Sequence, residues 1–271
     1  MNYLLDKHNR RIEYLRLALT DKCNLRCFYC YPKHYKLDRS NKELSFAEIS
    51  SILESASTLG IRKVRFTGGE PLLRNDVLDI IGKASSMKKF KEICLTTNGT
   101  RLSGLAGSLK EKGLSRINIS IDSLDPDIYC EITGKNVLDK VLKGVKAAKE
   151  AGLKIKINFV HLPKVNNKER RKVIDYCKKN NFDFQAIKRM DLNSGRGSVR
   201  PKGYQRPPNC LTCNKIRINS RGLLFSCLFT EAVGRISDFK NIKEAIMKTV
   251  EEKPKTTNFK CATRHMISIG G

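Results

Sequence analysis

The sequence predicts an α/β fold in which six parallel strands form an incomplete (β/α)6 barrel of the TIM type, followed by a C-terminal extension. Three observations predict it. Strand-like stretches alternate with amphipathic helical stretches from residue 14 to residue 187, the strands are polar on one face, and short polar motifs directly follow several of them. Strands that alternate with helices favour a parallel sheet with right-handed crossovers.

The predicted strands span residues 14–19, 63–67, 92–96, 116–121, 154–160 and 183–187. The clearest helix begins after Ser45, because Glu48 three residues later completes a capping box. Gly60 ends this helix, and further helices are predicted near residues 75–85, 102–112, 137–151 and 167–180.

Side chains alternate along each predicted strand between apolar and polar. Arg16 lies between Leu15 and Leu17, and Lys156 lies between Ile155 and Ile157. A parallel sheet covered by helices on both faces would carry nearly continuous apolar strands. We therefore expect helices on one face and a basic, polar interior on the other, with an exposed sheet face as the alternative.

The charge and cysteine content narrow the class of protein. The chain has 271 residues, a net charge of +26 and 10 Cys. A positive excess favours anionic partners such as phosphorylated metabolites, although spread-out charges also suit a solvated basic surface. Apolar runs are too short to cross a bilayer and no secretory signal is recognisable, so we expect a cytoplasmic protein with no membrane partner. Thiols in a reducing compartment indicate metal binding or catalysis.

Cys23, Cys27 and Cys30 form a C-x3-C-x2-C motif directly after the first strand. Three thiolates in one short loop can hold three irons of a [4Fe–4S] cluster and leave the fourth iron open for another ligand. A zinc knuckle completed by a His such as His34 is the alternative. Active sites of barrels lie at the C-terminal ends of the strands, where this motif falls.

Cys210, Cys213 and Cys227 form a second set, C-x2-C-x13-C. From the residues alone, a second cluster and a four-ligand zinc ribbon are equally good interpretations. Cys261 or His265 would complete the zinc site.

Residues 20–30 resemble the cluster loop of the radical S-adenosylmethionine (SAM) superfamily, and Gly-Gly-Glu-Pro at 68–71 fits the same superfamily. Within it, the chain resembles the GTP 3′,8-cyclase family over nearly its whole length. The segments that carry this resemblance are residues 5–6 with 10–12, 63–67, 96–99 and 118–123, the second cysteine set, and the terminal Gly270-Gly271.

The resemblance implies two [4Fe–4S] clusters, SAM as cofactor and GTP as substrate. The first cluster would cleave SAM to a 5′-deoxyadenosyl radical, which removes the 3′ hydrogen of the GTP ribose. The resulting carbon radical would close a ring at C8 of guanine, giving 3′,8-cyclo-7,8-dihydroGTP in the first step of molybdenum-cofactor biosynthesis. The open iron of the second cluster, on Cys210, Cys213 and Cys227, would meet the guanine.

The resemblance also assigns contact residues. SAM would be contacted by Tyr29, Gly69, Glu70, Ser120 and Met190. GTP would be contacted by Arg16, Lys63, Arg65, Thr96, Lys156, Lys215 and Arg217. The family usually has Arg where this chain has Lys215 and commonly has Arg where it has Gln185, and its connection at 191–209 is usually longer. These departures bear on substrate affinity more than on the type of reaction.

The expected organisation is a barrel at residues 1–190, a linker at 191–209, and a second-cluster region with a Gly-Gly tail at 210–271. Implied partners are an electron donor such as flavodoxin or ferredoxin and, downstream, cyclic pyranopterin monophosphate synthase. The protein would be a monomer or a homodimer. Binding of nucleic acid is not favoured, because aromatic residues for base stacking make up only 7% of the chain.

Two other functions compete with this interpretation. One is a radical SAM peptide-modifying enzyme with an auxiliary cluster, and the other is a zinc-bearing RNA-binding protein. The Gly-Gly terminus and the basic strand positions disfavour the first. Iron and sulfide analysis after anaerobic purification separates the classes, because two clusters hold about eight Fe per chain.

Deleting Gly270 and Gly271 tests the tail. In the family that the chain resembles, this end reaches the active site, and glycines let the backbone come close to a ligand. We expect both clusters and the fold to remain, and cyclised GTP to fall sharply while 5′-deoxyadenosine from uncoupled cleavage persists. Cyclisation at the normal rate would contradict the proposed role of the tail.

Overall fold

The computed structural model describes residues 3–31, 42–189 and 210–256. In these ranges one sheet has nine strands in the order β6-β5-β4-β3-β2-β1-β7-β8-β9. The strands are β1 (Tyr14–Ala18), β2 (Lys63–Thr67), β3 (Glu92–Thr97), β4 (Arg116–Ser120), β5 (Lys154–His161), β6 (Asp183–Lys188), β7 (Lys215–Ile218), β8 (Leu223–Phe225) and β9 (Gly234–Arg235). The helices are α1 (Phe46–Thr58), α2 (Val77–Ser86), α3 (Ala106–Glu111), α4 (Pro126–Thr133), α5 (Leu138–Glu150), α6 (Glu169–Asn180) and α7 (Ile242–Glu251).

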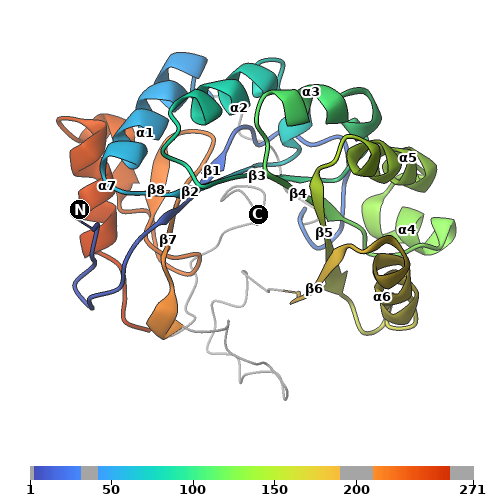
Figure 1. Cartoon of the computed structure of the whole chain (residues 1–271). Helices are drawn as coiled ribbons and strands as arrows, with labels where there is room; N and C mark the ends of the chain where they lie inside the picture. Colours follow the sequence, from blue (N-terminus) through green and yellow to red (C-terminus); the bar gives the residue numbers. More distant parts are fainter. Residues whose placement is uncertain (1–2, 32–41, 190–209, 257–271) are drawn as a thin grey trace.

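The sheet curves into an arc with the helices on its outer side and an open inner side (Figure 1). Strands β1 to β6 are parallel, and each pairs with the next strand along the chain. All six strands predicted from the sequence are present, with ends within one residue of the prediction. The expected incomplete barrel is therefore confirmed.

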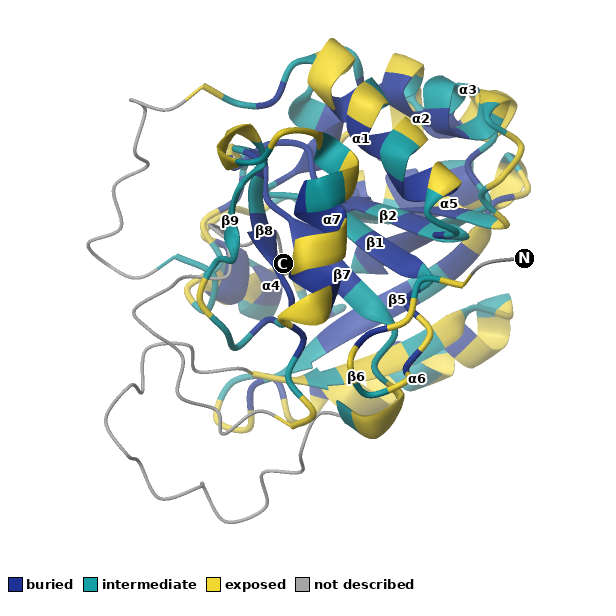
Figure 2. Ribbon diagram, turned by 90° about the vertical axis from the view of Figure 1, so that its left-hand side faces the viewer, coloured by how far each residue is buried: buried dark blue, intermediate teal, exposed yellow. Residues whose placement is uncertain are grey.

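Alternation along the strands separates a helix-covered face from an inner face, which we call the lumen face. Leu15, Leu17, Val64 and Phe66 are fully buried under the helices. Arg16 and Arg65 lie on the other face and are half-buried. In Figure 2 strands β1, β2, β7 and β8 are largely buried, whereas β6 is mostly exposed and the helices expose their outer sides.

Helix α1 begins as the sequence predicts. The Ser45 hydroxyl accepts from the Glu48 amide at 3.2 Å, and the Glu48 carboxylate accepts from the Ser45 amide at 2.7 Å. The helix buries Ile49, Ile52 and Leu53 against the sheet, the face expected from their helical spacing.

Two features of the helical layer differ from the expectation. The segment 102–112 is a 3₁₀ turn, Leu102–Gly104, followed by the short α3, because Gly104 and Gly107 weaken a continuous helix. Helices α4 and α7 were not predicted. For α4 the signals were present: Asp125 caps the first turn, and Gly134 ends the helix at φ +73°.

The C-terminal region extends the same sheet. Strand β7 pairs in parallel with β1, which sets Lys215 beside Tyr14 and Arg217 beside Arg16. The predicted division into barrel, linker and second-cluster region stays a prediction, since residues 190–209 lie outside the described ranges. None of the described helices is long and apolar enough to span a membrane.

Replacing Ser45 with Ala tests the capping box. Losing a Ser N-cap costs about 1 kcal/mol, because it leaves first-turn amides without an acceptor. We expect the free energy of unfolding in urea to fall by that amount. Ser51→Ala, inside the same helix at an exposed position, is the control and should not lower it. Equal stability of the two variants would contradict the capping role.

Candidate active site

The first cysteine set lies in the loop after β1, where backbone contacts fix the chain. Cys23, Cys27 and Cys30 are half-buried. The Cys30 amide donates to the Cys27 carbonyl at 2.9 Å, and the Arg26 amide donates to the Thr133 carbonyl of α4 at 2.9 Å. Helix α4, absent from the sequence prediction, therefore anchors this loop.

The three thiols lie close enough to oppose one another's ionisation. Burial raises the pKa of Cys27 well above its usual value, and Cys30, Asp122 and Cys23 raise it further. Burial raises the pKa of Cys30 to about 12, with Asp122 and Cys23 adding to the effect. Thiolates here need a nearby positive charge, which iron supplies. The donor set fits an iron–sulfur cluster.

A single zinc ion would require ligands that converge on one point. A cubane cluster instead takes each thiolate on a different iron. His34, the expected fourth zinc ligand, lies outside the described residues.

The Gly-Gly-Glu-Pro turn after β2 presses its backbone against the cluster loop. The Gly69 amide donates to the Thr20 carbonyl at 2.8 Å, and the Glu70 amide donates to the Lys22 carbonyl at 2.8 Å. A Cβ at Gly69 would lie 2.2 Å from the Lys22 carbonyl oxygen, and one at Gly68 would lie 2.3 Å from that of Thr20. Only glycines allow this approach.

Glu70 is completely buried and links this turn to the end of β3. Its carboxylate accepts from the Thr97 hydroxyl at 2.7 Å and from the amides of Asn98 at 2.7 Å and Leu72 at 3.0 Å. Burial raises its pKa to about 7, against the opposing effect of these hydrogen bonds. A contact between Glu70 and SAM stays a prediction.

Asp122 joins the cluster loop to the barrel, a role that the sequence prediction missed. The Tyr29 hydroxyl donates to its carboxylate at 2.6 Å, and the Val160 amide donates to it at 2.7 Å. Burial raises the pKa of Asp122 to about 6. Ser120 ends β4 two residues earlier. Met190, also predicted to contact SAM, lies outside the described residues.

Three arginines lie side by side on the lumen face, and we call them the arginine row. The strand register sets Arg16 beside Arg65 on β2 and beside Arg217 on β7. Burial, together with the charges of Arg217 and Arg65, lowers the pKa of Arg16 to about 9. No carboxylate of a described residue forms an ion pair with Arg65, Arg217 or Lys215. The row favours an anionic ligand.

Tyr14 lies close to three cations of the lumen face, and the sequence prediction missed it. Its ring centroid is 5.3 Å from the Lys63 ammonium, 5.5 Å from the Arg65 guanidinium and 6.0 Å from the Lys215 ammonium. These distances allow cation–π attraction. The signal was available, because Tyr14 shares the strand parity of Arg16.

Several buried polar atoms of the lumen face have no hydrogen-bond partner among the described residues. They are Arg65 Nε, Arg217 Nη1, the Tyr14 and Thr96 hydroxyls, both amide atoms of Asn118, and Asn158 Oδ1. Such atoms are costly and rare in a folded protein, so they indicate a polar ligand. Asn118 and Asn158 were not among the predicted contacts, although their alternation along β4 and β5 placed them on this face.

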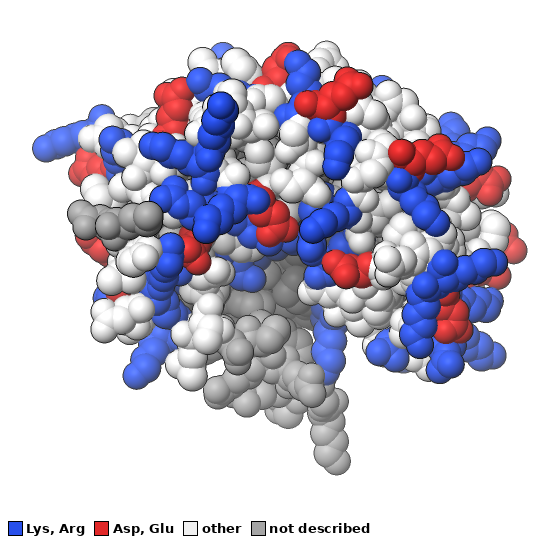
Figure 3. All heavy atoms as spheres, viewed as in Figure 1, with Lys and Arg blue, Asp and Glu red and all other residues white. Residues whose placement is uncertain are grey.

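Lys63 and Lys156, which were also predicted to contact GTP, differ from the arginine row. Lys63 forms an ion pair with Glu92, which Arg116 also approaches at 3.4 Å. The pKa of Lys156 is lowered, mainly by burial and then by the charge of Arg65. Outside the lumen, Lys and Arg cover the displayed face broadly with acidic residues among them (Figure 3). Much of the net charge is therefore ordinary solvated surface.

The second cysteine set lies at the other end of the same strands. Cys213 precedes β7 and Cys227 follows the antiparallel β8, so both lie at one end of this hairpin. Because β7 is parallel to β1, that end is opposite the first cysteine loop, which follows β1. The arginine row lies between the two sets. Cys261 and His265, the alternative zinc ligands, fall outside the described residues.

The electrostatics of Cys213 differ from those of the first set. Burial raises its pKa, but the Lys253 ammonium, the Lys215 backbone amide and the Lys215 charge together lower it below the usual value. These positive groups therefore make Cys213 easier to ionise than an ordinary thiol. This donor also fits an iron–sulfur cluster.

The radical SAM superfamily model matches residues 17–177. The chain is 33% identical to a protein named GTP 3′,8-cyclase from Shewanella denitrificans, over 100% of this chain and 97% of that protein. It is 34% identical to one of the same name from Clostridium perfringens, over 98% and 99%. The chain belongs to the GTP 3′,8-cyclase family. This radical SAM family uses [4Fe–4S] clusters and SAM.

Solved structures agree with the fold. Streptococcus suis SuiB bound to S-adenosylmethionine has a TM-score of 0.67 at 17% identity, over 92% of this chain and 66% of that one. The enzyme described as native anSMEcpe with bound AdoMet gives 0.66 at 19%, over 89% and 81%. The chain thus spans about two thirds of the length of SuiB. At such identities the likeness shows the fold alone, so it carries no conclusion about the substrate of this chain.

Gly69→Ala tests the contact between the turn after β2 and the cluster loop. The added Cβ would displace backbone at Lys22, so we expect the first cluster to be lost and iron to fall from about eight to about four per chain. Gly107→Ala is the matched control, because nothing lies within 4 Å of its Cβ. Full iron content and normal 5′-deoxyadenosine formation in Gly69→Ala would contradict the assignment.

Proposed function

We propose that this chain is a GTP 3′,8-cyclase that converts GTP to 3′,8-cyclo-7,8-dihydroGTP in the first step of molybdenum-cofactor biosynthesis. The arginine row between the two cysteine sets carries the proposal. It offers a triphosphate a site within reach of both predicted clusters. The names of the curated relatives support the same reaction.

The arginine row offers several positive charges to one polyanionic ligand. Arg217, Arg16 and Arg65 extend from three neighbouring strands, whose backbones lie about 4.8 Å apart, so one triphosphate could contact all three. Each guanidinium can hold phosphate oxygens through two parallel, charge-assisted hydrogen bonds. A bound triphosphate would supply the negative charge that no described carboxylate provides to Arg65 and Arg217. Lys63, Lys156 and Lys215 add positive charge around it.

At the first site, Cys23, Cys27 and Cys30 would hold a cluster that, together with SAM, supplies the radical for hydrogen removal from the ribose. Gly69 keeps the turn after β2 close to this loop, and the Tyr29–Asp122 hydrogen bond fixes the other side of the loop. Tyr29, Gly69, Glu70, Ser120 and Met190 are the proposed contacts to SAM.

The remaining polar atoms of the lumen would orient the substrate between the two ends of the barrel. Thr96, Asn118 and Asn158 each offer a buried hydrogen-bonding atom without a partner among the described residues. If the bound substrate closes off this site, water would be excluded from it, which would protect a reactive intermediate. A second cluster on Cys210, Cys213 and Cys227 would face the guanine end of GTP.

The wider assignments belong to the same proposal. An electron donor such as flavodoxin or ferredoxin would reduce the clusters, and cyclic pyranopterin monophosphate synthase would act on the product. A cytoplasmic monomer or homodimer with a barrel at 1–190 and a cluster-bearing region at 210–271 would carry out the reaction.

The direct test uses anaerobically reconstituted protein with SAM, dithionite and GTP. We expect cyclised GTP and 5′-deoxyadenosine in equal amounts. A parallel reaction without GTP should give only slow, uncoupled cleavage of SAM. Cleavage that GTP does not accelerate, with no cyclised product, would overturn the proposed substrate.

Arg65→Ala tests the arginine row. A charge-assisted hydrogen bond contributes about 1.5–3 kcal/mol, so we expect GTP to bind about 10- to 100-fold more weakly. Uncoupled cleavage of SAM should persist, because Arg65 does not touch the cluster loop. Lys83→Ala on the outer helix α2 removes the same charge and should leave binding unchanged. Unchanged GTP affinity in Arg65→Ala would show that the row does not hold the triphosphate.

A further inference from the structure

Lys253 is a buried lysine just beyond the end of α7. Its side chain is among the largest that are fully buried, and the residue is 2% exposed. No carboxylate of a described residue forms an ion pair with it. Lysines are almost never fully buried unless they are paired, because burying an isolated charge is costly. This ammonium therefore needs an anion that the described carboxylates do not provide.

The contacts of Lys253 all lie around the second cysteine set. Its ammonium donates to the Lys215 carbonyl at 2.8 Å and to the Ser226 carbonyl at 2.8 Å. The charge of this ammonium also lowers the pKa of the nearby Cys213 thiol. Ser226 directly precedes Cys227, so one side chain fastens the two strands that carry these cysteines.

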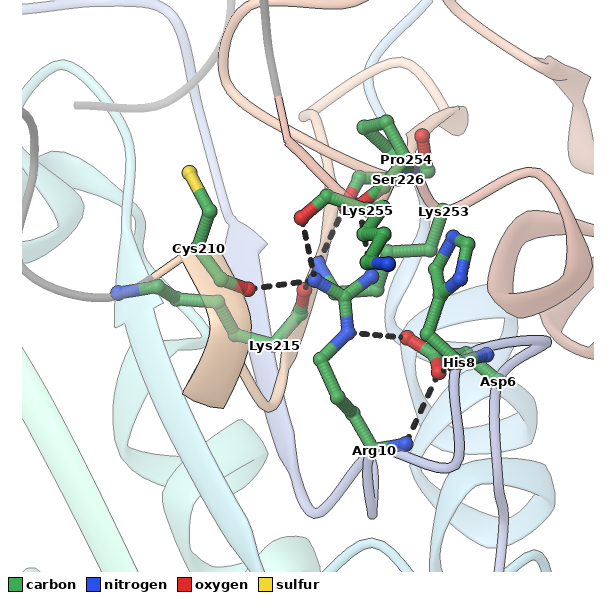
Figure 4. Close-up of polar contacts among 9 residues, drawn as sticks. All are labelled: Asp6, His8, Arg10, Cys210, Lys215, Ser226, Lys253, Pro254 and Lys255. Carbon is green, nitrogen blue, oxygen red and sulfur yellow. Dashed lines mark hydrogen bonds and ion pairs between the residues drawn. The ribbon is translucent and has the colours of Figure 1, made fainter.

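Arg10 links Cys210, the third cysteine of the set, to Pro254, the residue that follows Lys253. The Arg10 guanidinium donates to the Pro254 carbonyl at 2.7 Å and also to the Cys210 carbonyl, as Figure 4 shows. Arg10 has its own anion, because the Asp6 carboxylate accepts from it at 2.7 Å. The two cations thus hold the same loop, but only Arg10 is neutralised by a described carboxylate.

A cubane cluster on three thiolates supplies the missing anion. Such a cluster is negatively charged and becomes more so when it is reduced. We propose that Lys253 is a positioning residue for the second cluster, whose ammonium holds the cysteine-bearing strands in place and stabilises the reduced cluster. This inference rests on the proposed function, since it assumes a cluster and not zinc on Cys210, Cys213 and Cys227.

The two parts of this role have separate consequences. The hydrogen bonds to the carbonyls fix strand ends, and a merely structural residue could do the same. The positive charge beside a cluster ligand raises the reduction potential, because net charge and hydrogen bonds to the sulfurs set that potential. Removing the charge should shift the midpoint potential of the second cluster to a more negative value.

The test measures that potential by an anaerobic redox titration followed by electron paramagnetic resonance. The full-length protein carries Cys27→Ala, so that the first cluster does not contribute to the signal. Lys253→Met keeps most of the length of the side chain and removes the charge, whereas Lys253→Arg keeps the charge. Lys248→Met is the matched control, because Lys248 is exposed on α7 and pairs with Glu251 and Glu252.

We expect Lys253→Met to shift the midpoint to more negative potential, Lys253→Arg to restore most of the shift, and Lys248→Met to leave it unchanged. A parent-like midpoint and iron content in Lys253→Met would overturn the inference. If Lys253→Met loses its iron, retention in Lys253→Arg supports the charge role, and loss in both variants contradicts it.

The proposed function fails in a different way. Zinc in place of about four Fe in the Cys27→Ala parent would remove the second cluster itself, before any change at Lys253 is compared. A parent that holds the cluster and a Lys253→Met variant that matches it would leave the cyclase proposal intact and refute only the role of Lys253.

Discussion

The parallel pairing of β7 with β1 is the constraint on which the site depends. Strand β1 carries the first cysteine loop at its end, and β7 brings the second cysteine set to the opposite end of the same pair. The register of that pairing sets Arg217 beside Arg16. Leu15, Leu17 and Ile216, fully buried on the other face, hold the register, because a slip of one residue would turn them into the lumen. A site between two ends of one sheet thus follows from one strand pairing.

Buried cations in this protein fall into two groups. Arg10 has Asp6 at 2.7 Å, and Arg221 has Asp21 at 2.6 Å, so each is neutralised within the fold. Arg217 is as buried as Arg10, yet no described carboxylate pairs with it. Packing alone gives no reason to leave it so, because an unpaired buried charge destabilises the folded state. The contrast within one molecule supports a ligand that supplies the negative charge.

The sequence alone was sufficient to predict features that depend on local periodicity or on short residue spacings. Strand alternation identified Arg16 and Arg65 as lumen residues, and the spacing of Ser45 and Glu48 placed the start of α1. The sequence alone was not sufficient to predict contacts between residues that lie far apart along the chain. Tyr29 meets Asp122 across 93 residues, and Arg10 meets Cys210 across 200. No periodicity encodes such contacts, since they exist only once the barrel has curved.

Lys215 stands where the family usually has arginine, and the structure shows which of its contacts depend on that exchange. Lysine in place of arginine keeps the positive charge but loses the planar fork that binds phosphate at two points. Its backbone position does not depend on that exchange, because the Lys215 carbonyl accepts from Lys253 and its strand pairs with β1. Its ammonium is drawn toward the ring of Tyr14 and lies near Cys213. The exchange therefore removes directional hydrogen bonds from one end of the basic surface, while the arginine row retains the three guanidinium groups that we propose bind the phosphates.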